Sequence, residues 1–376
     1  MKNIFFYGNI MPSDMTSGIT KKVLSQISSL RKMGYQVYYT GYTSDGVAIF
    51  DNEDQKVFHE KYWFNSDKLN RYLRRWKLLA TAKKFVSSTD LSFELSYLRF
   101  HFFDGSYLRL LKKLKENGSK IIVEAHSYPY RSKKVNPYLL THIIDIIYEP
   151  FIRKYIDLVA AISNKKEIWG CKTVHIDNAI DINEVKLQNK KGAHKNKIRL
   201  ICVSNERYYH GYKKLIRGLY EYYKTNGERN ITINFVGEYK ESTKILVQEL
   251  SLDEHIYFSG KKYGSELEEA YNNADLGVGA FTARAGEQFG SSIKTKEYFA
   301  KGLPFINGWK EYSFDDSYPY VKRFPLNVDN IDFKKVEEFY DTIKSDKNMQ
   351  LNMRNFAKEN FTWLKQFEKV ISFFEN

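Results

Sequence analysis

The sequence predicts an α/β protein of two similar domains, each built on a mainly parallel sheet. Its 376 residues are too many for one ordinary domain and suit two of roughly 180 residues. Short apolar runs alternate with amphipathic stretches, which is the pattern of successive strand–helix units. The polar, strand-poor stretch 186–197 (KLQNKKGAHKNK) separates two such series, so we expect a linker between domains there.

The first series forms the predicted N-terminal domain, residues 1–185. An apolar run at 3–7 ends at Gly8 and predicts the first strand. A helix is expected after a loop to Gly18, because apolar residues recur there every three or four positions: Ile19, Val23, Ile27 and Leu30. Further strands are expected at 35–40, 93–100, 120–124 and 158–162, the last two being near-continuous apolar runs typical of a buried parallel sheet.

The second series forms the predicted C-terminal domain, residues 186–360, and repeats the same alternation. Strands are expected at 198–203, 231–236, 256–258, 276–280 and 304–306. Helices are expected at 213–224, 240–250, 265–272 and 292–300. Helical crossovers between strands are what a parallel sheet requires.

Composition limits the function classes. Hydrophobic residues make up 43% and charged residues 28%, which excludes wholesale disorder. The formal net charge of +14 calls for an acidic partner: nucleic acid, anionic lipid or a phosphorylated small molecule. Nucleic acid is not expected, because no nucleic-acid module is matched. Two cysteines, no apolar run of about 18 residues and no signal peptide predict a cytoplasmic protein.

Missing motifs exclude several enzyme classes. No G-x-G-x-x-G follows a predicted strand, which argues against a dinucleotide-binding dehydrogenase, and no G-x-x-x-x-G-K-[ST] occurs, which excludes a P-loop NTPase. The chain also has no Asp-x-Asp and no Cys/His cluster with zinc spacing, so no metal site is expected.

Loops that follow strands in open parallel sheets are where ligands bind, and two loops of the first domain are candidates. Ser17 and Gly18 let backbone N–H groups approach an anion, or they form an ordinary helix N-cap. His126, in the segment EAHSYPY, binds a substrate hydroxyl or phosphate, or is a structural hydrogen bonder.

A third candidate loop leaves the first strand of the second domain, at 203–214. Arg207, Lys213 and Lys214 can hold the charge of a leaving diphosphate. The alternative is a solvated basic start of a helix.

Among the candidate ligand-binding segments, 286–306 gives the most information about the ligand. Ser291 and Ser292 cap a predicted helix that Gly302 and Pro304 end. A helix N-terminus with two serines and Lys294 is suited to a phosphate, and a carboxylate one turn later, at Glu297, can accept both ribose hydroxyls. The alternative is a simple ion pair between Lys294 and Glu297, but the spacing favours a nucleoside diphosphate.

The stretch SSIKTKEYFAKGLP resembles the nucleotide-sugar signature of glycosyltransferase family 4. Other segments resemble this family in the same order along nearly the whole chain: SGITKKV, EAHSYPY, AAISN, DNAID, SNERYYHGYKKLI and FVGE. The resemblance implies a GT-B fold, with two Rossmann-like domains facing across a cleft and a last helix, 361–376, packing back on the first domain. It also implies retaining, metal-independent sugar transfer from a nucleotide sugar, without a cofactor.

The same resemblance implies roles for individual residues. Glu297 matches the glutamate that binds the donor ribose. Ser292, Ile293 and Lys294 match the donor diphosphate site, and Gly18 matches a glycine that approaches this diphosphate from the first domain. His126 matches the histidine that contacts the transferred sugar, and it is the first catalytic candidate.

The sequence departs from the family pattern at two places. The usual earlier glutamate falls on Phe289, so Glu287 is the nearest replacement and the second catalytic candidate. Asn205 and His210 occupy the positions of the usual Arg and Lys, which leaves Arg207 and Lys214 as the candidate diphosphate cations. A nucleotide-sugar epimerase of the same fold and a non-catalytic partner subunit therefore stay open as alternatives.

The segment 68–84 has seven basic residues and no acidic one. Its apolar residues recur at helical spacing, which predicts a helix lying on an anionic membrane, with Arg71, Arg74 and Arg75 towards lipid phosphates and Trp76 at the boundary. The alternative is an ordinary amphipathic helix with a solvated basic face. We therefore expect a peripheral enzyme on the inner face of the membrane, moving a sugar from a UDP-sugar to a lipid-linked glycan acceptor in the synthesis of cell-surface polysaccharide or glycoconjugates.

Overall fold

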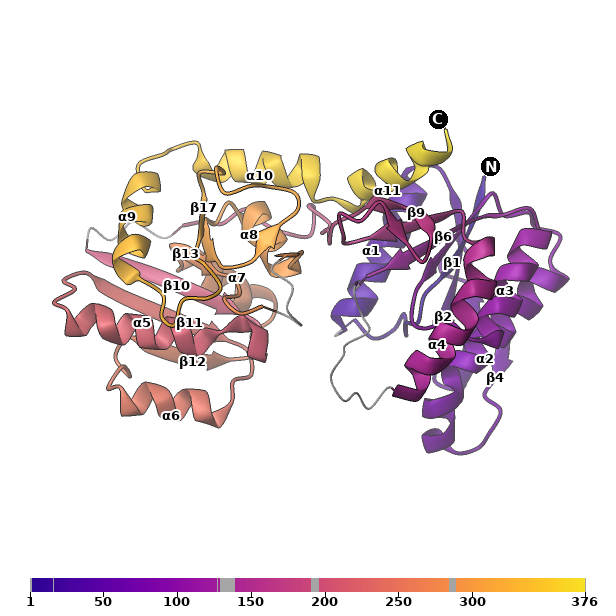
Figure 1. The fold of residues 1–376 in the computed structure, drawn as a ribbon, viewed down its shortest axis with the longest axis horizontal. Helices are drawn as coiled ribbons and strands as arrows, with labels where there is room; N and C mark the ends of the chain where they lie inside the picture. Colours follow the sequence, from indigo (N-terminus) through magenta and orange to yellow (C-terminus); the bar gives the residue numbers. More distant parts are fainter. Residues whose placement is uncertain are drawn as a thin grey trace. The chain divides into compact units, whose positions relative to one another are not determined.

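The computed structural model describes residues 2–15, 17–126, 128, 139–190, 196–283 and 289–375. The chain forms two compact units (Figure 1). Unit 1 comprises residues 1–177 and 363–376, and unit 2 comprises residues 178–362. Each unit has its own sheet and hydrophobic core, so the predicted α/β class with two parallel-sheet domains is confirmed.

Unit 1 is built on a nine-stranded sheet of order β4-β3-β2-β1-β5-β6-β7-β9-β8. The strands are β1 (Asn3–Tyr7), β2 (Gln36–Tyr42), β3 (Gly46–Phe50), β4 (Lys56–Lys61), β5 (Leu95–Arg99), β6 (Lys120–Ala125), β7 (Leu158–Ala161), β8 (Glu167–Ile168) and β9 (Cys171–His175). The central strands are parallel, and β3, β4 and β8 add antiparallel edges that the sequence did not predict.

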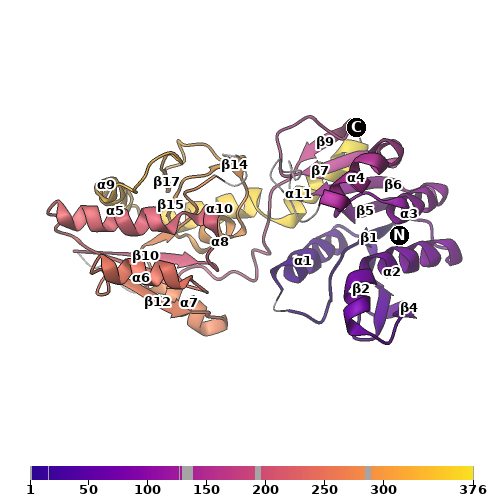
Figure 2. The same ribbon diagram turned by 60° about the horizontal axis from the view of Figure 1, so that its bottom comes forward.

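Helices cover both faces of this sheet (Figures 1 and 2). Helices α1 (Gly18–Lys32) and α11 (Trp363–Ile371) pack together on one face, and α2 (Asp67–Ser88), α3 (Gly105–Glu116) and α4 (Leu139–Ile152) form a layer on the other. The short 3-10 helices η1 (Arg153–Tyr155) and η3 (Ser372–Phe374) follow α4 and α11.

The C-terminal helix α11 is an integral part of unit 1. Trp363 and Phe367 are buried, and the Phe367 ring packs edge-on against Tyr97 of β5 with centroids 5.2 Å apart. The Gln366 side chain accepts a hydrogen bond of 2.9 Å from the Asp177 backbone N–H. The helix is therefore held by both aromatic packing and a backbone contact.

Unit 2 is built on a six-stranded parallel sheet of order β12-β11-β10-β13-β15-β17. Its strands are β10 (Lys197–Val203), β11 (Asn230–Val236), β12 (Ile256–Gly260), β13 (Leu276–Val278), β15 (Phe305–Asn307) and β17 (Val321–Arg323), with a separate pair of β14 (Phe289–Gly290) and β16 (Lys310–Glu311). Its helices are η2 (Tyr208–His210), α5 (Tyr212–Lys224), α6 (Glu241–Glu249), α7 (Gly264–Asn272), α8 (Ile293–Lys301), α9 (Phe333–Ile343) and α10 (Met349–Asn360).

The chain enters unit 2 at Asn178, upstream of the expected linker over 186–197. Gln188 lies within that stretch and is 5% exposed. Its side-chain amide donates to the carbonyl oxygens of Tyr271 and Ala274 at 2.5 and 2.7 Å, and its backbone N–H donates to Lys301. These bonds tie the first part of the stretch to the body of unit 2.

Candidate functional site

The N-terminus of α8 is the centre of the candidate donor site in unit 2. Ser292 is the N-cap residue, with extended backbone (φ −90°, ψ 131°), and makes no side-chain capping bond. The neighbouring Ser291 is already engaged, because its Oγ accepts from the Asn178 backbone N–H at 2.9 Å. The helix start therefore presents backbone N–H groups and the positive end of the helix dipole, which together favour an anion.

Glu297 lies one turn further along α8 and is only partly buried. One carboxylate oxygen accepts a long hydrogen bond of 3.4 Å from the hydroxyl of Tyr271, a residue that is itself 1% exposed. The Tyr271 hydroxyl thus contacts the carboxylate, while the residue as a whole keeps partial access to solvent.

Lys294 is placed differently from a surface cation. It is 9% exposed, and its Nζ donates to the Tyr212 hydroxyl at 3.0 Å and to the Gly279 carbonyl at 3.2 Å. Burial lowers the pKa of its ammonium to about 8. The side chain is held inside unit 2, while its backbone N–H belongs to the first turn of α8.

Two cations predicted to bind the diphosphate follow β10, and their side chains differ in exposure. Arg207 is exposed at the start of η2. Lys214 is partly buried, and its Nζ donates to the Leu326 carbonyl at 2.7 Å. His210 is 8% exposed and its Nδ1 accepts from the Arg207 N–H at 3.2 Å. Burial, with the charges of Lys294 and Arg207, lowers the pKa of His210 to about 3, so it is a neutral part of the loop.

In unit 1, Ser17 and Gly18 form the start of α1. Ser17 is the N-cap residue and its hydroxyl accepts from the Thr20 N–H at 3.3 Å, which confirms the helix-cap interpretation. Gly18 is exposed, and a Cβ added there would meet nothing within 4 Å. The space beside this helix start is open, as close approach of a ligand to the backbone requires.

His126 directly follows β6 and its side chain is exposed. Desolvation by the surrounding protein lowers the pKa of the imidazole to about 4, with Arg99 and Lys22 lowering it further and Glu124 opposing them. The ring is therefore neutral at pH 7 and can both donate and accept a hydrogen bond. The second catalytic candidate, Glu287, lies outside the described residues.

A buried polar cluster beside His126 is a feature that the sequence did not reveal. The Glu124 carboxylate is 0% exposed and lies 3.0 Å from Lys22 Nζ of α1. It also accepts from Gln26 Nε2 at 2.9 Å and from the Tyr97 hydroxyl at 3.1 Å. The available signal was a charged residue ending each of two apolar strands, Arg99 in β5 and Glu124 in β6.

The predicted membrane-facing set on α2 is only partly exposed. Arg71 and Arg74 are exposed, and Trp76 is 36% exposed with its Nε1 donating to Asp104 at 3.0 Å. The prediction was wrong for Arg75, which is 7% exposed and bonds to the Asp104 carboxylate at 2.5 Å and to the Phe102 carbonyl at 2.8 Å. Its guanidinium connects α2 to the N-cap of α3 and does not face outwards.

Exposed apolar side chains are concentrated in the α2–α4 layer. On α4 these are Leu139, Leu140, Ile143, Ile144, Ile146, Ile147 and Phe151, between 38% and 76% exposed. On and before α2 they are Trp63, Phe64, Leu69, Tyr72 and Trp76. The two helices are linked through the loop after β5, where Asp145 of α4 accepts from the Phe103 N–H at 2.8 Å next to the Arg75 contact. Such a concentration of exposed apolar groups marks an interaction surface.

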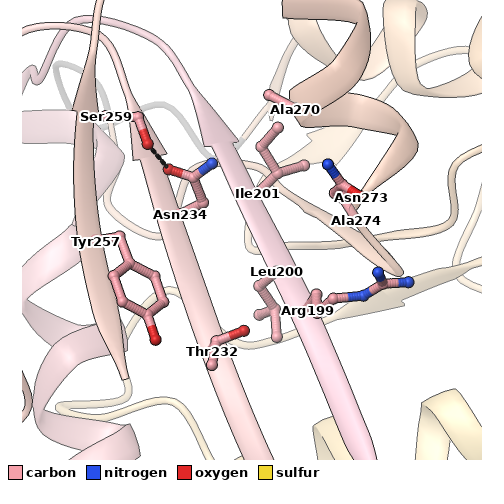
Figure 3. A pocket seen from close by; sticks show the side chains of 10 residues that line it. All are labelled: Arg199, Leu200, Ile201, Thr232, Asn234, Tyr257, Ser259, Ala270, Asn273 and Ala274. Atoms are coloured by element: carbon pink, nitrogen blue, oxygen red, sulfur yellow. Dashed lines mark hydrogen bonds between the residues drawn. The ribbon is translucent and has the colours of Figure 1, made fainter. Parts of the chain in front are cut away.

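A cavity of about 270 Å³ lies on the sheet of unit 2 (Figure 3). Side chains of β10, β11, β12 and α7 line it, and Ser259 donates to Asn234 across it at 2.6 Å. None of the predicted site residues lines this cavity. In the described ranges of the chain, no three His, Cys, Asp or Glu side chains gather where they could share a metal ion.

Comparison with known proteins identifies the fold. A glycosyltransferase from Rickettsia africae is 14% identical, with a TM-score of 0.68, and the match covers 100% of this chain and 98% of that one. Anabaena HepE in complex with UDP-glucose is 13% identical, with a TM-score of 0.56 and full coverage of both chains. WaaG, a glycosyltransferase involved in lipopolysaccharide biosynthesis, is 13% identical, with a TM-score of 0.58 and coverage of 97% and 98%. No family model and no curated protein sequence matches the chain. The structural neighbours show that this chain has the GT-B fold of glycosyltransferases.

Proposed function

We propose that this protein is a retaining glycosyltransferase that moves a sugar from a UDP-sugar to a glycan acceptor. The observation that carries the proposal is the arrangement on α8, where an N-terminus without a side-chain cap is followed one turn later by the half-buried Glu297. Backbone N–H groups and a carboxylate at this spacing suit the diphosphate and the ribose of one nucleotide. The GT-B fold and the family 4 resemblance of the same segment support this interpretation.

Each predicted residue has a chemical role in the proposed reaction. Transfer breaks the bond between the anomeric carbon of the sugar and the diphosphate oxygen. The oxygen of the acceptor hydroxyl forms the new bond to this carbon, and its proton passes to the departing diphosphate. The amides of Ser292, Ile293 and Lys294 and the exposed Arg207 stabilise the charge that develops on the diphosphate. We propose that these groups replace a divalent metal. Lys214 donates one of its three N–H groups to the Leu326 carbonyl, which leaves two for the diphosphate.

Unit 1 supplies the remaining proposed contacts. Gly18 allows the backbone at the start of α1 to approach the diphosphate, and the open space beside it supports this role. The neutral imidazole of His126 binds a hydroxyl of the transferred sugar and orients it for attack by the acceptor.

The choice of uridine is a separate part of the proposal. HepE, one of the structural neighbours, was solved in complex with UDP-glucose. Thermal-shift titrations with UDP, GDP and ADP test this choice, and UDP should stabilise the protein most. The expected turnover is release of UDP from a UDP-sugar when a glycan acceptor is present, with no loss of rate in EDTA.

The ribose assignment has its own variant. Glu297→Gln should weaken UDP binding by about tenfold, because one charged hydrogen-bond partner is lost. Glu249→Gln, at an exposed glutamate on α6, is the matched control and should bind UDP like the wild type. Absence of nucleotide binding by the wild type would contradict the proposed function, and unchanged binding by Glu297→Gln would contradict the ribose assignment.

Interconversion of UDP-sugars without an acceptor would instead indicate an epimerase, and binding without turnover would indicate a non-catalytic subunit.

We further propose that the acceptor is lipid-linked and that the α2–α4 layer rests on the inner face of the membrane, in the synthesis of cell-surface glycans. The exposed apolar face of α4 and the exposed cations Arg71 and Arg74 on α2 support this placement. One structural neighbour, WaaG, is a glycosyltransferase involved in lipopolysaccharide biosynthesis. No helix in the described part of the chain is long and apolar enough to cross a membrane.

A further inference from the structure

Arg99 ends β5 inside the buried polar cluster at the carboxyl end of the unit 1 sheet. It pairs in register with Glu124 of the neighbouring parallel strand, so both side chains lie on the same face of the sheet. This is the face covered by α1, which contributes Lys22 and Gln26 to the cluster. His126 lies just beyond β6, close enough for the charges of the cluster to shift its pKa. The carboxyl ends of strands are where open α/β sheets bind their ligands.

The guanidinium of Arg99 makes no side-chain hydrogen bond to the residues that the structure describes. Glu124 is already bonded by Lys22, Gln26 and Tyr97, and the Arg99 Nε is 3.6 Å from the carboxylate, which is too far for a hydrogen bond. Arg99 is only 9% exposed, and its Nε is buried without a hydrogen-bond partner. Across the described residues, Glu124 is the only acidic group within ion-pair distance of Arg99.

Counted over the described residues, the cluster also carries an excess of positive charge. It holds two cations, Lys22 and Arg99, against the single carboxylate of Glu124, and the three side chains are 8%, 11% and 0% exposed. A buried cation without a full set of acceptors is costly. An oxyanion placed against the guanidinium supplies both the missing charge and the missing acceptors.

We propose that Arg99, with Lys22 behind it and His126 beside it, forms a subsite for an oxyanion carried by the acceptor, either a phosphate or a carboxylate group. The inference rests on the proposed glycosyltransferase function and adds that the acceptor is anionic near the hydroxyl that receives the sugar. The donor diphosphate has its own proposed site at the start of α8. A guanidinium presents two parallel N–H groups to such an oxyanion, which an ammonium does not.

Inorganic phosphate, with acetate as a separate probe for a carboxylate, tests the subsite in the full-length protein. Histidine labelled with ¹⁵N reports the ring signals, and the His126 signal is identified by its loss in His126→Gln. Phosphate is titrated with and without saturating UDP. The test variants are Arg99→Gln and Arg99→Lys, and the matched control is Arg109→Gln, at an exposed arginine on α3.

Phosphate or acetate should shift the His126 signal in the wild type and in Arg109→Gln with the same affinity, whether or not UDP is bound. Arg99→Gln should bind the probe at least tenfold more weakly, and Arg99→Lys severalfold more weakly, with UDP affinity unchanged in both. The melting temperature of Arg99→Gln should not fall, because Lys22 and Glu124 remain as a balanced pair. If Arg99→Gln does not fold, the probe affinity of Arg99→Lys tests the subsite.

Three results would overturn the subsite. They are no shift of His126 at saturating phosphate and acetate, equal probe affinity in the Arg99 variants, and a parallel loss of UDP affinity, which would place Arg99 in the donor site. Failure of the wild type to bind any nucleotide would contradict the proposed function instead. The subsite can still be tested in that case, because the phosphate titration without UDP does not require nucleotide binding.

Discussion

The Lys296 ammonium and the Glu311 carboxylate form an ion pair of 2.5 Å that is completely buried in unit 2. Lys296 Nζ also lies 4.4 Å from the centroid of the Phe361 ring, and Thr295 donates to the other oxygen of Glu311 at 2.7 Å. The pair connects α8, which carries the candidate donor site, to the short strand β16. The orientation of α8 therefore depends on two charges that have no access to water.

Removing one member of this pair should be strongly destabilising. Lys296→Met removes the ammonium that pairs with the buried Glu311 carboxylate, and we expect the free energy of unfolding to fall by about 3–5 kcal/mol. The double variant Lys296→Met/Glu311→Leu should recover most of this loss, because it removes both charges of the buried pair. Urea unfolding of both variants measures the difference, and a double variant as unstable as the single one would contradict this explanation.

Glu60 makes the stability of unit 1 depend on pH. Desolvation raises its pKa, but hydrogen bonds from Lys84, Thr81 and Lys77 outweigh this and lower it from 4.5 to about 2. A carboxyl group with a lowered pKa stabilises the folded state above its unfolded pKa, and this contribution is lost as the pH falls through the folded value.

We therefore expect Glu60→Gln to lower the free energy of unfolding by about 1–3 kcal/mol at pH 7. The difference from the wild type should shrink between pH 4.5 and 2. Denaturant unfolding at several pH values checks this. Glu249→Gln is the control and should follow the wild type, whereas a pH-independent difference for Glu60→Gln would exclude the ionic explanation.

Substitution of Gly18 should affect nucleotide binding without affecting folding. Gly18→Ala should leave the melting temperature unchanged or slightly higher, because the added methyl group meets nothing and alanine favours a helix. UDP affinity should fall by about tenfold if the diphosphate approaches this backbone. Gly118→Ala is the contrasting control, since its φ of 87° disfavours alanine, and it should lower the melting temperature without changing UDP affinity. Unchanged UDP affinity in Gly18→Ala would remove Gly18 from the donor site.

If α4 docks on the membrane, substitutions on its exposed apolar face should weaken binding to lipid vesicles. The wild type should sediment with vesicles that contain anionic lipid and much less with neutral vesicles. Ile143→Asn/Ile147→Asn should reduce this binding about tenfold, because two exposed apolar contacts are lost. Ile245→Asn, at an equally exposed isoleucine on α6 of unit 2, should bind like the wild type. Equal binding by all three proteins would contradict the proposed orientation.

Local patterns in the sequence were sufficient to predict most of the central strands of both sheets and several of the helices between them. The run at 3–7 is β1, and Ser292 is the N-cap of α8, because apolar periodicity and capping residues act over a few positions. Helix α4 was not predicted, because its broad apolar face is exposed while the polar Asp145 is buried, which reverses the usual orientation of an amphipathic helix.

Contacts between distant residues could not be predicted from such patterns. Arg75 was assigned to the membrane face of α2, but its partner Asp104 comes 29 positions later and draws it inwards. Lys294 matches a diphosphate cation in sequence, yet it bonds to Tyr212, which lies 82 positions away. The identity of a residue fixes its charge, but the position of its partner depends on tertiary packing.

The return of α11 to unit 1 has a consequence for synthesis on the ribosome. Residues 178–362 form unit 2 as one continuous stretch, whereas unit 1 lacks Trp363, Gln366 and Phe367 until after all of unit 2 has been translated. A domain that is continuous in sequence can fold as it emerges. Unit 1 is therefore translated first but completes its fold last. Until α11 has been translated, the α1 side of its sheet lacks this helix and is exposed to aggregation.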